Sequence, residues 1–154
     1  MNVPPRRATP SLLHVDSILH HLHGGDASAE VCRFLRAEFA HFAGVAVYRL
    51  DEGTLRRDGL AGEPADFPES VPLGTGVIGE VARDGVSRPA GSPPTSTAPP
   101  GEVAVAIRTA GVVEGVLTVR VGMPPSADAS DVRFLEQVAA KLAPEMGLPR
   151  TRLL

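Results

Sequence analysis

A glycine-rich turn in the middle of the sequence offers backbone groups that could bind an anion or a polar oxygen. Gly74 and Gly76 flank Thr75, and the segment that follows, 76–83, has the apolar spacing of a short amphipathic helix. The first N–H groups of a helix have no acceptor within it, so they bind anions readily. The same glycines also suit a tight turn, with Gly85 just past the helix end. Both interpretations stay open, but a P-loop is excluded because no Gly-Lys-Ser or Gly-Lys-Thr follows.

A second group of candidates lies on the last expected strand and its neighbours. Because side chains alternate along a strand, Glu114, Thr118 and Arg120 are expected on one face. If that face lines a pocket, Glu114 and Thr118 could orient a ligand that carries a hydrogen-bond donor, with Tyr48 and Arg108 on neighbouring strands. The alternative is a solvated surface with cross-strand ion pairs to Arg108 or Arg120, which is the more ordinary arrangement.

Three hydroxyl residues, Thr95, Ser96 and Thr97, lie in the middle of a proline-rich segment. This segment, 89–101, contains five prolines and no bulky apolar residue, which predicts a loop. The hydroxyl groups could close over a bound molecule as a lid, or the loop could simply be mobile.

The histidines and the one cysteine do not form a recognisable metal or catalytic site. His20 and His23 share a helix face, but imidazolium groups at a helix C-terminus are favourable without a metal, so we expect no metal and no cofactor. All five histidines precede residue 42, which argues against a Ser-His-Asp set. Cys32 is the only cysteine, so an intrachain disulfide and a CxxC metal site are excluded. A buried thiol is the ordinary expectation for it, and an intermolecular disulfide is the alternative.

Composition and charge exclude several classes of partner. The net charge is −3 with acidic and basic residues interleaved, so we expect no nucleic acid and no anionic lipid surface as partner. No segment approaches the roughly 18 consecutive apolar residues of a transmembrane helix. No apolar run of signal-peptide length follows the two N-terminal arginines, so we expect a cytoplasmic location.

Apolar periodicity places the candidates in a small α+β domain. We expect a folded unit over 26–148, preceded by a disordered tail over 1–10 and an N-terminal helix over 11–24, and followed by a tail over 149–154. Within the unit, the expected elements are a helix from 26 to 43, strands over 45–50, 54–60 and 70–72, a helix over 76–83, strands over 102–108 and 112–121, and a helix over 128–143. Pro144 is expected to end the last helix. The order predicts a central antiparallel β-sheet of five to six strands with helices on both faces.

The run PLGTGVIGEVARDG, residues 72–85, resembles the segment PLGxGxxGxVAxxG of GAF domains, which are small-molecule sensor modules of signalling proteins. Shorter segments fit the family in the same order: the strand 45–50, EVAVAI at 102–107, GVVEGVL at 111–117, and the closing helix with Asp131 and Leu135. The resemblance covers about residues 27–143. The departures are Ala106 in place of a common proline, Glu114 in place of an aliphatic residue, and the segment 89–101 in place of a strand and loop.

The resemblance implies a GAF/PAS-like fold in which the 76–83 helix covers a ligand pocket. The candidate ligand-binding residues are Tyr48, Gly74, Thr75, Gly76, Val77, Ile78, Thr95, Ser96, Thr97, Arg108, Glu114 and Thr118. In the family the terminal helices often form a dimer interface, and the candidates for it are Leu12, Val15, Leu19, Leu22, Leu135 and Leu142.

From this resemblance we expect a non-catalytic regulatory domain, with no catalytic residues, that signals as a homodimer. Its partner would be a small molecule of unknown identity or a signalling protein. No kinase, cyclase, phosphodiesterase or DNA-binding segment follows residue 143, so we expect it to act on a separate protein or to belong to a larger one. The cyclic-nucleotide signature NKxFDE and a pocket cysteine for a bilin are both missing.

Two alternatives stay open. A GAF fold with a filled pocket could serve protein–protein interaction alone, and a cavity beneath the 76–83 helix with at least one unpaired polar group would argue against it. A free methionine sulfoxide reductase is the other alternative. It is disfavoured because that activity in the family uses cysteines on pocket loops, whereas Cys32 lies on a scaffold helix.

Overall fold

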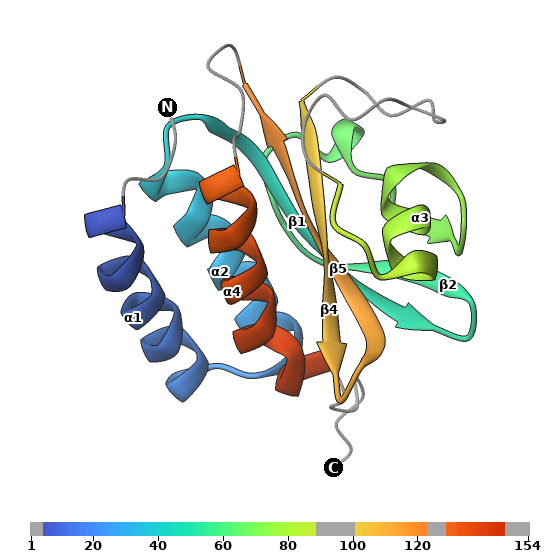
Figure 1. Cartoon of the computed structure of the whole chain (residues 1–154), viewed down its shortest axis with the longest axis horizontal. Coiled ribbons are helices and arrows are strands. Elements are labelled where there is room, and N and C mark those ends of the chain that lie inside the picture. Colours follow the sequence, from blue (N-terminus) through green and yellow to red (C-terminus); the bar gives the residue numbers. More distant parts are fainter. Residues whose placement is uncertain (1–4, 89–100, 123–128, 147–154) are drawn as a thin grey trace.

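The structure, a computed structural model, describes residues 5–88, 101–122 and 129–146. Its centre is a five-stranded antiparallel sheet in the order β3-β2-β1-β5-β4 (Figure 1). The strands are β1 (Phe42–Asp51), β2 (Thr54–Ala61), β3 (Ser70–Pro72), β4 (Glu102–Thr109) and β5 (Val112–Val121). The helices are α1 (Pro5–His21), α2 (Gly24–Glu38), α3 (Gly76–Asp84) and α4 (Ala129–Met146), with a short 3-10 helix, η1 (Pro64–Asp66), before β3. The predicted α+β class and antiparallel sheet are confirmed, with five strands in the described residues.

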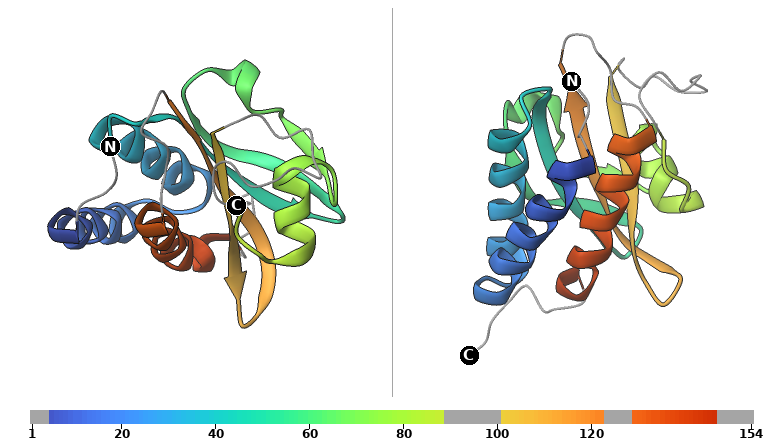
Figure 2. Two further views of the ribbon diagram at one scale, coloured as in Figure 1. Left: turned by 45° about the horizontal axis from the view of Figure 1, so that its top comes forward. Right: turned by 60° about the vertical axis from the view of Figure 1, so that its left-hand side comes forward.

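Helices cover the two faces of the sheet unequally. One face is covered by α2 and α4, on which α1 packs from outside, and the other carries α3 alone (Figures 1 and 2). Side chains of the central strand β1 alternate between the two faces of the sheet. Val45 and Val47 pack in the core under the three helices, whereas Ala46 and Tyr48 pack in the smaller core under α3.

The turn into α3 has the backbone that its glycines predict. Gly76 has a φ of +63° at the first position of α3, and Gly85 ends the helix in the left-handed region, as expected. Gly79 is required for a different reason. A Cβ atom at this position would lie 2.6 Å from the carbonyl oxygen of Pro72, so the absence of a side chain lets α3 lie directly against the end of β3.

Helix boundaries differ from the sequence prediction in three places. The helix α2 ends at Glu38 and not at 43, because Phe42 is the first residue of β1. The other two differences involve proline. The helix α1 begins at Pro5, inside the segment 1–10 that we expected to be a tail, because proline is tolerated in the first turn of a helix. The helix α4 continues past Pro144 to Met146. Proline removes one backbone hydrogen bond there, but the buried side chain of Met146 keeps the last turn packed against the core.

The apolar stripe proposed as a dimer interface is used within the chain instead. Val15, Leu135 and Leu142 are fully buried, because α1 packs on α4 and α4 packs on the sheet. The partly buried members of the stripe, Leu12, Leu19 and Leu22, pack against the same core. The prediction is therefore wrong for Val15, Leu135 and Leu142, which are not accessible to a second copy. For the other three residues a dimer contact stays a prediction. The predictions for the loop residues Thr95, Ser96 and Thr97 and for the tail 149–154 lie outside the described residues.

Candidate functional site

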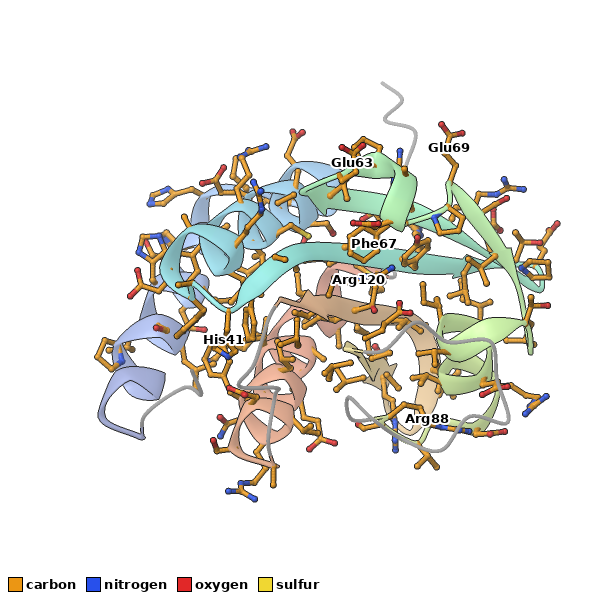
Figure 3. The ribbon with its side chains drawn as sticks, turned by 90° about the horizontal axis from the view of Figure 1, so that it is seen from above. His41, Glu63, Phe67, Glu69, Arg88 and Arg120 are labelled. Atoms are coloured by element: carbon orange, nitrogen blue, oxygen red, sulfur yellow. The ribbon has the colours of Figure 1, made fainter. Side chains whose placement is uncertain are left out.

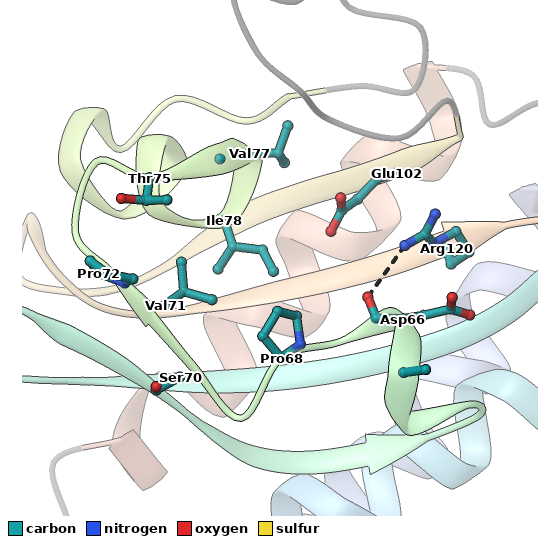
Figure 4. A pocket seen from close by; sticks show the side chains of 12 residues that line it. Asp66, Pro68, Ser70, Val71, Pro72, Thr75, Val77, Ile78, Glu102 and Arg120 are labelled. Carbon is teal, nitrogen blue, oxygen red and sulfur yellow. Dashed lines mark hydrogen bonds between the residues drawn. The ribbon is translucent and has the colours of Figure 1, made fainter.

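A cavity of about 520 Å³ lies between the N-terminal turn of α3, the edge strand β3, η1 and the ends of β4 and β5 (Figure 4). This volume falls in the usual range of small-molecule sites, roughly 300–1,000 Å³. The lining residues are Ala65, Asp66, Pro68, Ser70, Val71, Pro72, Thr75, Gly76, Val77, Ile78, Glu102 and Arg120. Most of the wall is apolar, and the charged side chains gather at one end (Figure 4).

The charged end of the cavity is formed by Glu102, Arg120 and Asp66 (Figure 4). Glu102 and Arg120 are directly opposite each other on β4 and β5. Figure 3 shows Arg120 beside Phe67, whereas His41 lies well away from them on the α4 side of the sheet. The residue opposite Arg120 on β1 is Gly44, and the lack of a side chain there leaves room for the Phe67 ring.

The Arg120 guanidinium is only partly satisfied by the protein. Its Nη2 donates to the backbone oxygen of Asp66 at 3.3 Å (Figure 4). Its Nε is buried and has no hydrogen-bond partner. A buried donor without an acceptor destabilises a protein by roughly 1–3 kcal/mol, so such groups in native structures need an explanation.

The Glu102 carboxylate is 8% exposed and is also incompletely paired. Its Oε2 lies 3.0 Å from the hydroxyl of Thr118, which lies 3.1 Å from the carbonyl oxygen of Val103 as well. One hydroxyl proton cannot serve both acceptors at once. Burial raises the pKa of Glu102, while the Thr118 hydrogen bond and the charge of Arg120 act in the opposite direction. Asp66 adds a smaller upward effect on this pKa.

The opposite end of the cavity is the N-terminus of α3. The backbone N–H groups of Gly76, Val77 and Ile78 belong to the first turn, which has no acceptor of its own in the helix. The Thr75 side chain at the N-cap position makes no capping hydrogen bond. This end of the cavity can therefore accept a negative or polar group of a ligand.

Four of the residues proposed from the sequence line this cavity together. They are Thr75, Gly76, Val77 and Ile78, all from the start of α3. Gly74 does not line it, because its N–H donates to the carbonyl oxygen of Gly79 at 2.9 Å and closes the turn.

Tyr48 and Thr118 lie behind the cavity wall, not on its surface. Both are fully buried. The Tyr48 hydroxyl donates to the carbonyl oxygen of Pro68 at 2.7 Å, and burial raises its pKa, so it remains a donor. Thr118 holds the carboxylate of Glu102. They position lining residues and do not contact the cavity.

Glu114 lies elsewhere because β5 has a bulge. Ile107 of β4 pairs with Gly115, but the next residue of β4 pairs with Val113, so Glu114 is the extra residue. The bulge interrupts the alternation of side chains along β5, and the prediction that Glu114 and Thr118 share one face depended on that alternation. Glu114 instead lines a separate hollow of about 400 Å³ next to Met146.

Arg108 also lies away from the cavity. Its side chain is exposed, and its Nη2 donates to the carbonyl oxygen of Gly85. This contact fastens β4 to the C-terminal end of α3. The prediction that Arg108 and Glu114 share a pocket with the glycine turn is therefore wrong.

Sequence reasoning missed Glu102 and Arg120 as site residues. The usable signal was a carboxylate and a guanidinium near the ends of two strands joined by a short turn. Such residues become neighbours when antiparallel strands pair, but only the register shows that they are directly opposite.

The remaining reactive residues are separate from this cavity. Among the described residues, no group of three His, Cys, Asp or Glu side chains could hold a metal ion. Cys32 is fully buried in the core under the three helices, and burial raises the pKa of its thiol. No helix in the described part of the chain is long and apolar enough to cross a membrane.

Comparison with known proteins identifies the fold but not a close relative. No protein-family model and no curated protein sequence matches the chain. A free methionine-R-sulfoxide reductase from Neisseria meningitidis, solved with its substrate, is 20% identical with a TM-score of 0.80, over 92% of this chain and 89% of that one. The GAF domain of a phosphoenolpyruvate-protein phosphotransferase from Coxiella burnetii is 15% identical with a TM-score of 0.79, over 90% of this chain and 92% of that one. The reductase fRMsr of Staphylococcus aureus, also with substrate, is 18% identical with a TM-score of 0.78, over 96% of this chain and all of that one. The chain has the GAF fold.

The reductase structures correct one expectation from the sequence. We expected that the chain is not an enzyme, but enzymes share its fold over nearly their whole length. The fold therefore does not separate catalytic from regulatory GAF proteins, and the expectation of a non-catalytic domain loses its support.

Proposed function

We propose that this GAF-fold chain binds a small molecule in the cavity between α3 and the sheet. The observation that carries the proposal is the cavity of about 520 Å³, one end of which is lined by the charged side chains of Glu102 and Arg120. A ligand with polar groups could make charge-assisted hydrogen bonds there.

A filled pocket kept only for protein–protein contact fits these features less well. Such a pocket would have apolar side chains in contact across it. Here the region beneath α3 retains about 520 Å³, and its charged end holds the incompletely paired Glu102 and Arg120.

We also propose that binding of the small molecule is regulatory, and the arrangement of the helices around the sheet supports this. The cavity lies between α3 and the sheet. The helices α2 and α4, with α1 outside them, lie on the other face (Figure 2). A ligand can therefore occupy its site without displacing these helices. They would carry the response to a signalling protein or to a second copy of the chain.

The test is the thermal midpoint of the protein with a panel of amino acids, carboxylic acids, amines, purines and inorganic anions. A ligand that binds only the folded state at 100 times its Kd adds about 2.7 kcal/mol, which raises the midpoint by several degrees. Arg120→Gln should abolish the shift. Arg133→Gln, an exposed arginine on α4, is the matched control and should retain it.

The outcomes separate the alternatives. A shift that Arg120→Gln removes and Arg133→Gln keeps supports a ligand in this cavity. A shift that both variants keep places the ligand elsewhere, and a flat panel favours the protein-interaction alternative.

Chemistry on free methionine-R-sulfoxide is a second candidate function, because two reductases of this fold were solved with that substrate bound. The assay is incubation with methionine sulfoxide and dithiothreitol, followed by chromatography of free methionine. Cys32→Ser is the informative variant, since Cys32 is the only thiol and is buried outside the cavity. Turnover lost in this variant would require the helical layer to open, whereas turnover retained would exclude a protein thiol.

A further inference from the structure

We propose that residues 63–66, which include η1, form a lid over the charged end of the cavity. The lid is held closed by the hydrogen bond from Arg120 to the carbonyl oxygen of Asp66. This inference rests on the proposed function and specifies how access to the same cavity is regulated. It comes from a contrast between the two halves of the connection from β2 to β3, residues 62–69.

The second half of this connection is anchored to the sheet. Phe67 is fully buried. Its carbonyl oxygen accepts from Arg57 Nη1 at 2.7 Å, and that of Pro68 accepts from the Tyr48 hydroxyl at 2.7 Å. The carbonyl oxygen of Glu69 accepts from the N–H of Arg57 at 2.9 Å. Three consecutive carbonyl oxygens are therefore fixed by hydrogen bonds from β1 and β2.

The first half, the lid, is held much less firmly. None of its residues is buried. Its two backbone hydrogen bonds stay within the turn, because the N–H of Asp66 donates to Glu63 and the N–H of Phe67 donates to Pro64. In the part of the chain that the structure describes, one hydrogen bond ties the lid to another element, from Arg120 Nη2 to the Asp66 carbonyl oxygen at 3.3 Å (Figure 4). Segments with few buried contacts open at a low cost in free energy.

The backbone on the two sides of the lid defines the points between which it can move. Gly62, just before the lid, has a φ of +125°, which a residue with a side chain rarely adopts. Phe67, just after it, is the first anchored residue. A rotation between these two points lifts Ala65 and Asp66, which line the cavity, and leaves the hydrogen bonds of the second half in place.

Opening the lid changes the charge at this end of the cavity. In the closed state, Asp66 and Glu102 bring two carboxylates to an end that has one guanidinium, that of Arg120. In the open state, the Asp66 carboxylate leaves this end and Arg120 Nη2 loses its acceptor. A ligand group that accepts a hydrogen bond replaces the Asp66 carbonyl oxygen at this nitrogen, so binding of such a ligand stabilises the open lid.

The first experiment is amide hydrogen exchange of the whole chain, followed by NMR without any ligand. A single helical turn does not persist once its tertiary contact is lost, so the N–H groups of Asp66 and Phe67 report on the lid. The N–H of Arg57 reports on the anchored half. Arg120→Met keeps the length of the side chain and removes its donors. It should speed exchange at Asp66 and Phe67 about tenfold or more, because a hydrogen bond from a charged group is lost.

Exchange at Arg57 should not change in Arg120→Met, because the anchored half keeps its hydrogen bonds. Arg133→Met, at an exposed arginine on α4, is the matched control and should leave all three N–H groups as they are.

The second experiment tests whether the lid covers the charged end. Glu102→Cys places a thiol beneath it, and Thr75→Cys places one at the α3 end of the same cavity. Cys32 is fully buried and therefore contributes a slow background. When Arg120→Met is added, the thiol at position 102 should react with iodoacetamide about tenfold faster, in proportion to the opening of the lid. The thiol at position 75 should react at an unchanged rate.

Each result decides the inference. Unchanged exchange at Asp66 and Phe67 in Arg120→Met overturns it. Equal acceleration at Arg57 also overturns it, because the whole connection then opens as one unit. The same holds for equal acceleration of the thiols at positions 102 and 75, which would show a general loosening. Neither readout uses a ligand, so the failure of the lid and the failure of the proposed function are separate results.

Discussion

The two faces of the sheet differ in how much apolar surface covers them and in whether their polar groups are paired. Among the described residues, 23 buried apolar side chains form the core under α1, α2 and α4, and 11 form the core under α3. The larger core is continuous, whereas the smaller one ends at the cavity. The single helix α3 covers less of its face than α2 and α4 cover on the other side.

One buried polar atom at the cavity lacks a partner, whereas two buried polar side chains between the helices and the sheet have one. On the helical face, His41 Nε2 lies 3.3 Å from Asp131 Oδ1, and Glu145 Oε1 accepts the N–H of Gly24 at 2.9 Å. On the α3 face, Arg120 Nε has no partner. We infer from this difference that the helical face is built for stability and the α3 face for binding.

The largest effect that tests this comparison is expected from truncating apolar side chains on the two faces. Phe134→Ala should lower the free energy of unfolding by about 3–5 kcal/mol, because Phe134 is 2% exposed and its loss leaves an enclosed void. Ile78→Ala should cost about 2 kcal/mol, the low end for such a change, because Ile78 already borders a cavity. Urea denaturation measures both values.

Thr75→Ala is the control for that pair, since Thr75 is exposed and its side chain caps nothing. It should change stability by no more than about 0.5 kcal/mol. If Ile78→Ala costs as much as Phe134→Ala, the α3 face is packed as tightly as the helical face, and the comparison is wrong.

A smaller effect is expected from removing one charged side chain on each face. Glu145→Ala should cost about 1–3 kcal/mol, because it leaves the N–H of Gly24 at the start of α2 without its acceptor. Arg120→Met should cost nothing and should stabilise the protein by up to about 1 kcal/mol, because it removes a buried donor that has no acceptor. Thermal unfolding without ligand measures the difference, and equal losses in the two variants would show that Arg120 is structural.

The smallest effect is expected from the pH dependence of Glu102. Burial raises the pKa of this carboxyl group, so the folded state holds its proton to a higher pH than the unfolded state, where the pKa is about 4.3. Between the two pKa values the unfolded state binds fewer protons, and the Glu102 contribution to stability falls as pH rises. Glu102→Gln should therefore raise the thermal midpoint at pH 7, and the gain should vanish below about pH 4.

Glu69→Gln is the matched control for the pH series, because Glu69 is exposed. Its midpoint should follow that of the unaltered protein at every pH. A gain in Glu102→Gln that persists at low pH would mean that the effect is one of packing and not of charge.

Much of the fold could be predicted because it depends on local signals. The run from Pro72 to Gly85 specified the turn, the helix α3 and its left-handed end through the conformational preferences of its glycines. Amphipathic spacing located the helices and strands in their correct order. The ends of α1 and α4 could not be predicted from proline alone, because proline is tolerated in the first turn of α1 and the buried Met146 keeps the last turn of α4 packed.

The candidate site was predictable only at the α3 end. Thr75 and its three neighbours were found because they adjoin the glycine turn. Glu114 was wrongly predicted to line the cavity. A bulge in β5 moves it out of the alternating pattern, and no feature of the local sequence indicates that bulge. Leu135 and Leu142 looked like a free stripe because a sequence shows which residues are apolar and not what covers them.

The sequence by itself determined the elements, their order and the turn chemistry around α3, because these depend on residues a few positions apart. Only the tertiary structure decided which charged side chains are neighbours in the cavity. Glu102 and Arg120 become neighbours through the register of β4 and β5, and Asp66 joins them from a segment distant in the chain. Register and bulges are set by the packing of the whole sheet against two different layers, so the site depends on contacts that no local pattern specifies.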